Sequence, residues 1–310
     1  MTTLRFVAGL VLFLVIVGGA TSCGGPVQDV GVNNSYREYA ESGGLREIIP
    51  GRYVFTRWDN VTFNSGVIVT DNGVVVLDSL LNEDVARGVR QSISEVTNQS
   101  VRVLVSSTFH EFFSGGVAAY SDALNIGHEE YQRHLIETLT EKDESLLEGR
   151  LPDQVYRGRV TLYIGGKELQ ILHLGRGHTR GDSVVFIPSE RMVYMSELYS
   201  HREFPSLTDS YVNDWIKALD VAGDMEADIF VPGHGLITED PRASREGMQE
   251  FKALLIELRD AVQGAIEAGM AEVEAVNEIE LPRYEDWLGY ERGLPGAVRR
   301  IYQELTVGLD

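Results

Sequence analysis

Hydrophobic and polar residues alternate from Ile48 onward in patterns that predict the strands and helices of an α/β protein. Residues 66–70 and 74–78 are rich in valine and flank Asp71-Asn72-Gly73, a turn sequence typical of a β-hairpin. Apolar residues three or four positions apart over 83–96 then predict a helix. Residues 101–105 follow as a strand of the buried type.

The rest of the chain continues this succession of strands and helices. Further strands are expected at 53–56, 161–164, 169–174, 183–187, 192–195 and 229–231. Helices are expected after Gly115-Gly116, at 129–147, 212–221 and 242–268, and at the end of an aromatic tail spanning 284–305. Two blocks of strands that each end in helices predict a layered α/β sandwich.

The N-terminal residues have the pattern of a targeting segment. An apolar run over 6–19 follows a single positive charge, Arg5, and has the length of a secretory signal rather than of a membrane-spanning helix. It ends in Ala20-Thr21-Ser22-Cys23, which resembles a bacterial lipobox, although Ala20 stands where leucine is usual. We expect a signal peptide at 1–22, a lipidated Cys23 and a flexible tether at 23–45.

This interpretation places the protein outside the cytoplasm, in the periplasm or at the cell surface, attached to the membrane only through a lipid on Cys23. A plain secretory signal and an uncleaved anchor are the alternatives. The substitution Cys23→Ser separates them, because only a lipid-anchored protein would then leave the membrane fraction.

Composition adds two restrictions. The 310 residues carry a formal net charge of -20, which repels phosphate backbones and argues against a nucleic-acid partner. The plainest interpretation of this acidity is solubility, and it identifies no substrate. Cys23 is the only cysteine, so no intramolecular disulfide can form.

Three of the seven histidines, His110, His178 and His234, stand where strands run into loops. Such junctions carry the active sites of many layered α/β proteins. Imidazole is the commonest side-chain ligand of zinc and also binds iron. One loop histidine is most often an ordinary hydrogen-bonding residue, whereas three that converge from separate loops would form a metal site.

The segments around these histidines resemble the metallo-β-lactamase superfamily. The similarity lies in Gly177-His178-Thr179-Arg180-Gly181-Asp182, in Val231-Pro232-Gly233-His234-Gly235 and in Asp78 after the predicted hairpin. Asn125-Ile126-Gly127-His128-Glu129 resembles a family segment whose histidine is not a ligand. The resemblance implies a four-layer αββα sandwich over 46–270, with a C-terminal helical extension over 271–310.

The chain departs from the family at its signature His-x-His-x-Asp-His. Counted back from Gly115-Gly116, only His110 remains, and Thr108, Phe112 and Phe113 replace the first histidine, the aspartate and the last histidine. The acid that bridges two metals in the family corresponds here to Glu197. The resemblance therefore implies that the second metal is lost and that its space is filled by the two phenylalanines.

The residues that remain suggest one zinc ion, with iron compatible with the same ligands, held by His110, His178 and Glu197. His234 is a fourth ligand or a partner of the bound water, and we assign the catalytic roles to His234 and Glu197. Asp78 and Asp182 are expected to accept hydrogen bonds behind the ligands. His201 is expected to be a surface loop histidine.

Two classes of function are compatible with such a site. The first is a mononuclear hydrolase that uses a metal-bound water on an ester, lactone, amide or phosphoester of a small-molecule substrate. The second is a non-catalytic descendant whose pocket binds a ligand or partner. Trp58, Phe63, Tyr199 and Phe204 lie in two loops that could form an apolar rim. The pattern leaves the oligomeric state open.

Overall fold

The computed structural model describes residues 43–238 and 240–309. The predicted signal peptide, Cys23 and the tether up to residue 42 lie outside these residues. The first strand begins at Gly44, so the last two residues of the predicted tether belong to the folded part of the chain.

The first β-sheet has seven strands that follow one another in sequence order. They are β1 (Gly44–Ile49), β2 (Arg52–Trp58), β3 (Thr62–Thr70), β4 (Gly73–Leu77), β5 (Val101–Ser106), β6 (Leu124–His128) and β7 (Gln154–Tyr156). Strands β1 to β4 pair antiparallel, whereas β4 to β7 pair parallel. Because parallel strands end at the same edge, the residues after β4 and β5 come together there.

The second sheet has five strands in the order β12-β11-β10-β9-β8. They are β8 (Arg159–Ile164), β9 (Lys167–Leu172), β10 (Val184–Ile187), β11 (Met192–His201) and β12 (Ile229–Gly235). The β11–β12 pair is parallel, and its register shifts between Tyr194 and Ser196 and again before Ser200. These irregularities lie at the carboxyl end of the pair.

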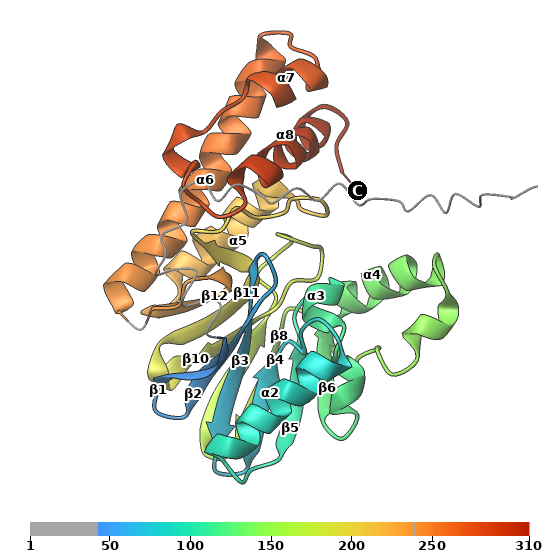
Figure 1. Cartoon of the computed structure of the whole chain (residues 1–310), viewed down its shortest axis with the longest axis vertical. Helices are drawn as coiled ribbons and strands as arrows, with labels where there is room; N and C mark the ends of the chain where they lie inside the picture. The colour runs from blue at the N-terminus through green and yellow to red at the C-terminus, as the bar shows by residue number, and fades with distance from the viewer. Residues whose placement is uncertain (1–42, 239, 310) are drawn as a thin grey trace, which may run out of the picture. The chain divides into compact units, whose positions relative to one another are not determined.

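Helices cover the outer faces of both sheets. The α-helices are α2 (Glu83–Val96), α3 (Glu111–Ser114), α4 (Glu129–Thr140), α5 (Val212–Asp224), α6 (Pro241–Glu267), α7 (Glu272–Glu278) and α8 (Tyr290–Thr306). Figure 1 shows α2 lying along the first sheet and α6, α7 and α8 gathered together. Within the described part of the chain, none of the helices has both the length and the apolar character needed to cross a bilayer.

Separate apolar clusters hold these layers together. Alternate residues of the facing strands, such as Val75 and Val105 in the first sheet and Ile171 and Val185 in the second, fill the space between the sheets. A second cluster lies between the first sheet and α2. A third packs the second sheet against α5, α6 and α8. The predicted four-layer sandwich with C-terminal helices is therefore confirmed.

Two local predictions were wrong. Gly115-Gly116 is followed only by a short 3-10 turn at Val117–Tyr120, while α3 begins earlier, at Glu111. The segment directly after His110 is therefore helical, because Phe113 and Ser114 donate their backbone N–H groups to the His110 carbonyl. In addition, His201 ends strand β11 and is not a loop residue, and its Nδ1 donates to the Leu236 carbonyl.

Candidate metal centre

Four separate segments bring the predicted ligands to one cavity of about 710 Å³. His110 precedes α3, His178 lies between β9 and β10, Glu197 is in β11 and His234 is in β12. All four residues line this cavity. The convergence that the sequence suggested is therefore present in the fold.

His110, His178 and Glu197 form the tightest group. One ligand atom from each lies within 4.8 Å of the others. Oε2 of Glu197 accepts a hydrogen bond from His110 Nδ1 at 2.9 Å and lies 3.2 Å from His178 Nδ1. The latter contact lacks hydrogen-bond geometry, so the buried His178 Nδ1 has no hydrogen-bond partner.

This unsatisfied nitrogen fits a metal ligand. A buried polar atom without a partner costs free energy unless another group satisfies it. Two imidazoles and one carboxylate at close range are a donor set that binds Zn²⁺. The residues present therefore fit a metal ion of this kind.

Charge in the group is strongly coupled. Burial alone would raise the pKa of Glu197, but the imidazoles of His178 and His110 hold it well below its usual range. Burial alone would lower the pKa of His110, but the carboxylates of Glu197 and Asp209 outweigh it and raise the pKa to about 10. Without a metal, His110 is thus a cation between two anions.

Asp209 is a site residue that the sequence did not indicate. Its Oδ2 accepts a hydrogen bond from His110 Nε2 at 2.9 Å, opposite the nitrogen that faces Glu197. The hydrogen bond from His110 is also the main reason that the pKa of Asp209 is lowered. Asp209 stands in the loop between β11 and α5, in no recognisable motif, so only the fold reveals this contact.

His234 lies beside the tight group rather than within it. Its Nε2 is 3.6 Å from Glu197 Oε1. Its Nδ1 donates to the Thr62 carbonyl, which leaves Nε2 as the atom that faces the cavity side of Glu197. Both oxygens of the buried Glu203 accept hydrogen bonds from Thr62 and so hold Thr62 in place. The role of His234 as a ligand stays a prediction.

Close backbone approaches allow the segments to meet. A Cβ atom on Gly233 would lie 2.4 Å from the backbone of Ser196, next to Glu197. A Cβ atom on Gly177, before His178, would lie 2.3 Å from the side chain of Leu198 on the other side of Glu197. Only glycine lets strand β12 and the loop before His178 approach β11 so closely.

The two aspartates lie behind the ligands and accept hydrogen bonds there. Asp78 accepts from the backbone and side chain of Ser107 and from the side chain of Ser196. Burial raises the pKa of Asp78 to about 7 despite these bonds. Asp182 accepts from the backbone and side chain of Thr179, which follows His178. The geometry is that expected for both residues.

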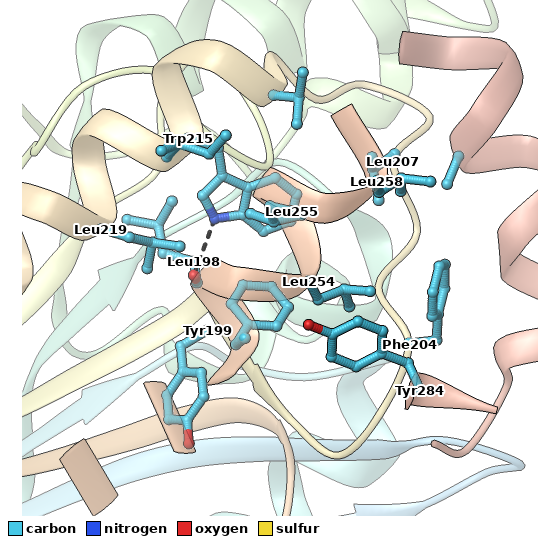
Figure 2. Packing of buried hydrophobic residues seen from close by; sticks show 14 of the residues in the cluster. Leu198, Tyr199, Phe204, Leu207, Trp215, Leu219, Leu254, Leu255, Leu258 and Tyr284 are labelled. Carbon is cyan, nitrogen blue, oxygen red and sulfur yellow. Dashed lines mark hydrogen bonds between the residues drawn. The ribbon is translucent and has the colours of Figure 1, made fainter. Parts of the chain in front are cut away.

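The apolar core supports the site from below. Trp215 of α5 donates its indole N–H to the Leu198 carbonyl at 3.0 Å, and Figure 2 shows this bond among the buried side chains. The same indole packs against His178 in an edge-to-face arrangement, with ring centroids 5.2 Å apart. One buried tryptophan therefore fixes both the strand of Glu197 and the ring of His178. Tyr199, expected at the cavity rim, is instead buried in this core.

The two phenylalanines of the altered signature have different positions. Phe113 is fully buried, and its ring packs on His234 at 5.1 Å. Phe63 also contacts His234, with ring centroids 5.4 Å apart, and packs edge-on against Phe113. Phe112 is 57% exposed and stacks on Phe63. The expectation that both signature phenylalanines fill the site was therefore wrong for Phe112, which lines the cavity as an exposed ring.

Comparison with known proteins agrees with this architecture. The family model of the metallo-beta-lactamase superfamily matches residues 61–234, more than half of the chain. A metallo-beta-lactamase type 2 of Elizabethkingia meningoseptica is 20% identical over 194 residues, 60% of this chain and 75% of that protein. The 2,4-dinitroanisole O-demethylase subunit alpha of Nocardioides sp. (strain JS1661) is 27% identical over 252 residues, 79% of this chain and 70% of that protein.

Solved structures show the same fold. A metallo-beta-lactamase from Pontibacter korlensis superposes with a TM-score of 0.60 at 20% identity, over 69% of this chain and 98% of its own. A stereoselective inverting sec-alkylsulfatase from Pseudomonas sp. superposes with a TM-score of 0.70 at 16% identity, over 90% of this chain and 53% of its own. The matched family model ends at His234 and contains every predicted ligand. The chain belongs to the metallo-beta-lactamase superfamily, a family of metal-binding hydrolases.

Proposed function

We propose that the protein is a mononuclear hydrolase that holds one zinc ion through His110, His178 and Glu197. The observation that carries the proposal is the buried His178 Nδ1, which lacks a hydrogen-bond partner although it lies 3.2 Å from the Glu197 carboxylate. A cation among the three residues would satisfy this nitrogen. When bound, zinc supplies a Lewis acid and a water of lowered pKa.

The chain's own residues divide the remaining work. Asp209 fixes the ring of His110 from the side away from Glu197. His234 keeps its Nδ1 proton on the Thr62 carbonyl, so Nε2 is the atom that would accept a further proton beside Glu197. The carboxylates of Glu197 and Glu203 outweigh burial and raise the pKa of this ring, which favours its uptake of a proton. This arrangement supports His234 as the proton acceptor, in place of the aspartate that the altered signature lacks.

The surroundings of His234 support one ion rather than two. Phe63 and Phe113 pack on its ring, and neither offers an atom that binds a metal. Thr108, which stands where the signature has its first histidine, is buried with its hydroxyl unpaired. We therefore place one ion at the His110 side of the cavity.

The substrate class follows from the family only in outline. Proteins similar to this chain include metallo-beta-lactamases and a linear primary-alkylsulfatase of Pseudomonas sp. (strain ATCC 19151). We accordingly propose an ester, lactone, amide or phosphoester of a small molecule as the substrate. The cavity of about 710 Å³ is within the size range of small-molecule sites.

Metal analysis of the purified protein tests the proposal. We expect about one zinc ion per chain, lost in His178→Ala and retained in the control His201→Ala, whose ring lies outside the ligand group. Two ions per chain would refute the mononuclear site. A folded wild type that takes up no metal would refute the hydrolase. Stoichiometric zinc without turnover of any ester, lactone, amide or phosphoester would favour the non-catalytic alternative.

A further inference from the structure

One face of the C-terminal helix α8 forms part of the wall of the same cavity. Gly289 precedes the helix, and Arg292, Gly293, Gly296 and Ala297 follow on it with helical spacing. A Cβ atom on Gly296 would meet nothing within 4 Å, so this part of the wall faces open space. Helix α8 lies beyond residue 234, where the family match ends.

Arg292 is the only arginine or lysine among the residues that line the cavity. The other two arginines of α8 have partners, since Arg299 pairs with Glu272 and Arg300 donates to the Ser210 carbonyl. Within the described residues, the Arg292 side chain forms no hydrogen bond or ion pair. Its guanidinium group is thus free to meet a ligand.

Acids on the cavity wall do not neutralise this cation. Glu197 and Asp209 accept hydrogen bonds from His110, and Glu203 accepts a hydrogen bond from Thr62. Asp59, the remaining acid of the wall, does not pair with Arg292 in the described structure. The chain has a net charge of -20, so this unpaired cation at the cavity wall is not part of a general basic surface. It can therefore distinguish anionic ligands from neutral ones.

Part of the remaining wall is apolar and aromatic. Phe112 is exposed and stacks on Phe63 with ring centroids 5.3 Å apart and an interplanar angle of 17°. Phe204 and Leu207 line the cavity as well. Exposed aromatic rings in a cavity favour binding of planar or apolar groups.

We propose that Arg292 selects substrates that carry a negatively charged group next to an apolar or aromatic one. The guanidinium group binds the anion through charge-assisted hydrogen bonds, and the Phe112–Phe63 stack receives the apolar part. The inference rests on the proposed function for the reaction that follows, but binding of the anion itself needs neither metal nor turnover.

Calorimetric titration with a pair of probes of similar shape tests this assignment. Naphthalene-1-sulfonate carries the charge, and methyl 1-naphthyl sulfone is its neutral counterpart. We expect Arg292→Gln to raise the Kd of the sulfonate about tenfold and to change the Kd of the sulfone by less than about twofold. The control Arg299→Gln, on the same helix, should leave both values within about twofold of the wild type.

The Asp59→Asn variant adds an opposite expectation, because loss of a negative charge on the wall should tighten binding of the sulfonate alone. Equal affinity of the wild type for both probes, no binding of the sulfonate, or equal weakening of both probes by Arg292→Gln would overturn the assignment. The titrations are made before and after treatment with a chelator. Preference for the sulfonate through Arg292 in a protein that binds no metal would refute the proposed hydrolase but not the role of Arg292. Metal-dependent hydrolysis without this preference would refute only the role of Arg292.

Discussion

Replacing Asp209 by asparagine tests how the candidate site holds His110, a predicted metal ligand. Asp209 contacts His110 Nε2 at 2.9 Å, while Nδ1 of the same ring faces Glu197. The amide oxygen of the substituted side chain could still accept this hydrogen bond, but the amide has no charge with which to polarise the ring. The change therefore removes the electrostatic part of the contact and keeps its shape.

Its expected magnitude follows from the geometry. Loss of a carboxylate that orients a metal-binding histidine typically lowers metal affinity by about 10- to 100-fold. Because the Asp209 side chain is 35% exposed, solvent screens its charge, and the lower end of this range applies. We expect zinc to bind about tenfold more weakly, which corresponds to about 1.4 kcal/mol.

Competition for zinc with a chromophoric chelator at constant pH measures this affinity. Asp59→Asn is the matched control, since Asp59 lines the same cavity and has no contact with His110. Its zinc affinity should stay within about twofold of the wild type. Wild-type affinity in Asp209→Asn would show that the His110 ring needs no support from Asp209. Equal losses of zinc affinity in both variants would show that the overall charge of the cavity, and not the contact with His110, causes the loss.

Two further predictions concern stability. Gly296→Ala should raise the free energy of unfolding in urea by about 0.5–1 kcal/mol, because alanine favours the helix and the new methyl group meets nothing. Gly293→Ala should lower the free energy of unfolding by about 1–3 kcal/mol, because its Cβ would lie 2.6 Å from the Phe204 ring. Equal effects of the two substitutions on this free energy would contradict the packing of α8. Burial, reinforced by the nearby His173, lowers the pKa of His128 to about 3, so the unfolded chain binds this proton first and the folded state loses stability as pH falls below about 6.5. Between pH 7 and 5 the free energy of unfolding of the wild type should fall by up to about 2 kcal/mol more than that of His128→Asn. Parallel pH profiles of the two proteins would show that His128 does not cause this loss.

Local patterns predicted much of the fold because their causes are local. Helix α2 begins and ends where expected, at Glu83 and Val96, since Asn82 caps it and its buried residues recur at helical spacing. The hairpin of β3 and β4 turns at Asp71-Asn72, as its sequence indicated. By contrast, β6 and β7 were missed as strands, because they are short and depend on pairing with distant segments.

The sequence indicated the residues that meet in one cavity only where family motifs mark them, and their roles as ligands stay predictions. His110, His178, Glu197 and His234 all line one cavity. Asp209 and Arg292 reach this cavity from a loop and from a helix whose local sequence has no signal of chemistry. Both residues act on segments that are about 100 or more positions away in the sequence, and hydrophobic periodicity carries no information about such distant contacts. Glu203 was missed for the same reason, as it acts through Thr62.

Backbone strain beside the cluster argues that the site is preorganised. Asp78, Leu80 and Ser196 are non-glycine residues with positive φ values of 68°, 62° and 47°, a conformation that costs about 1–3 kcal/mol for each residue. Hydrogen bonds hold all three: Asp78 and Ser196 bond to each other, and the Leu80 backbone pairs with Phe113 and Gly116. Strain of this kind persists only where the surroundings determine the backbone fully. Because Ser196 directly precedes Glu197, the carboxylate is aimed at His110 and His178 by the fold itself, so a metal would meet ligands already in place rather than assemble them.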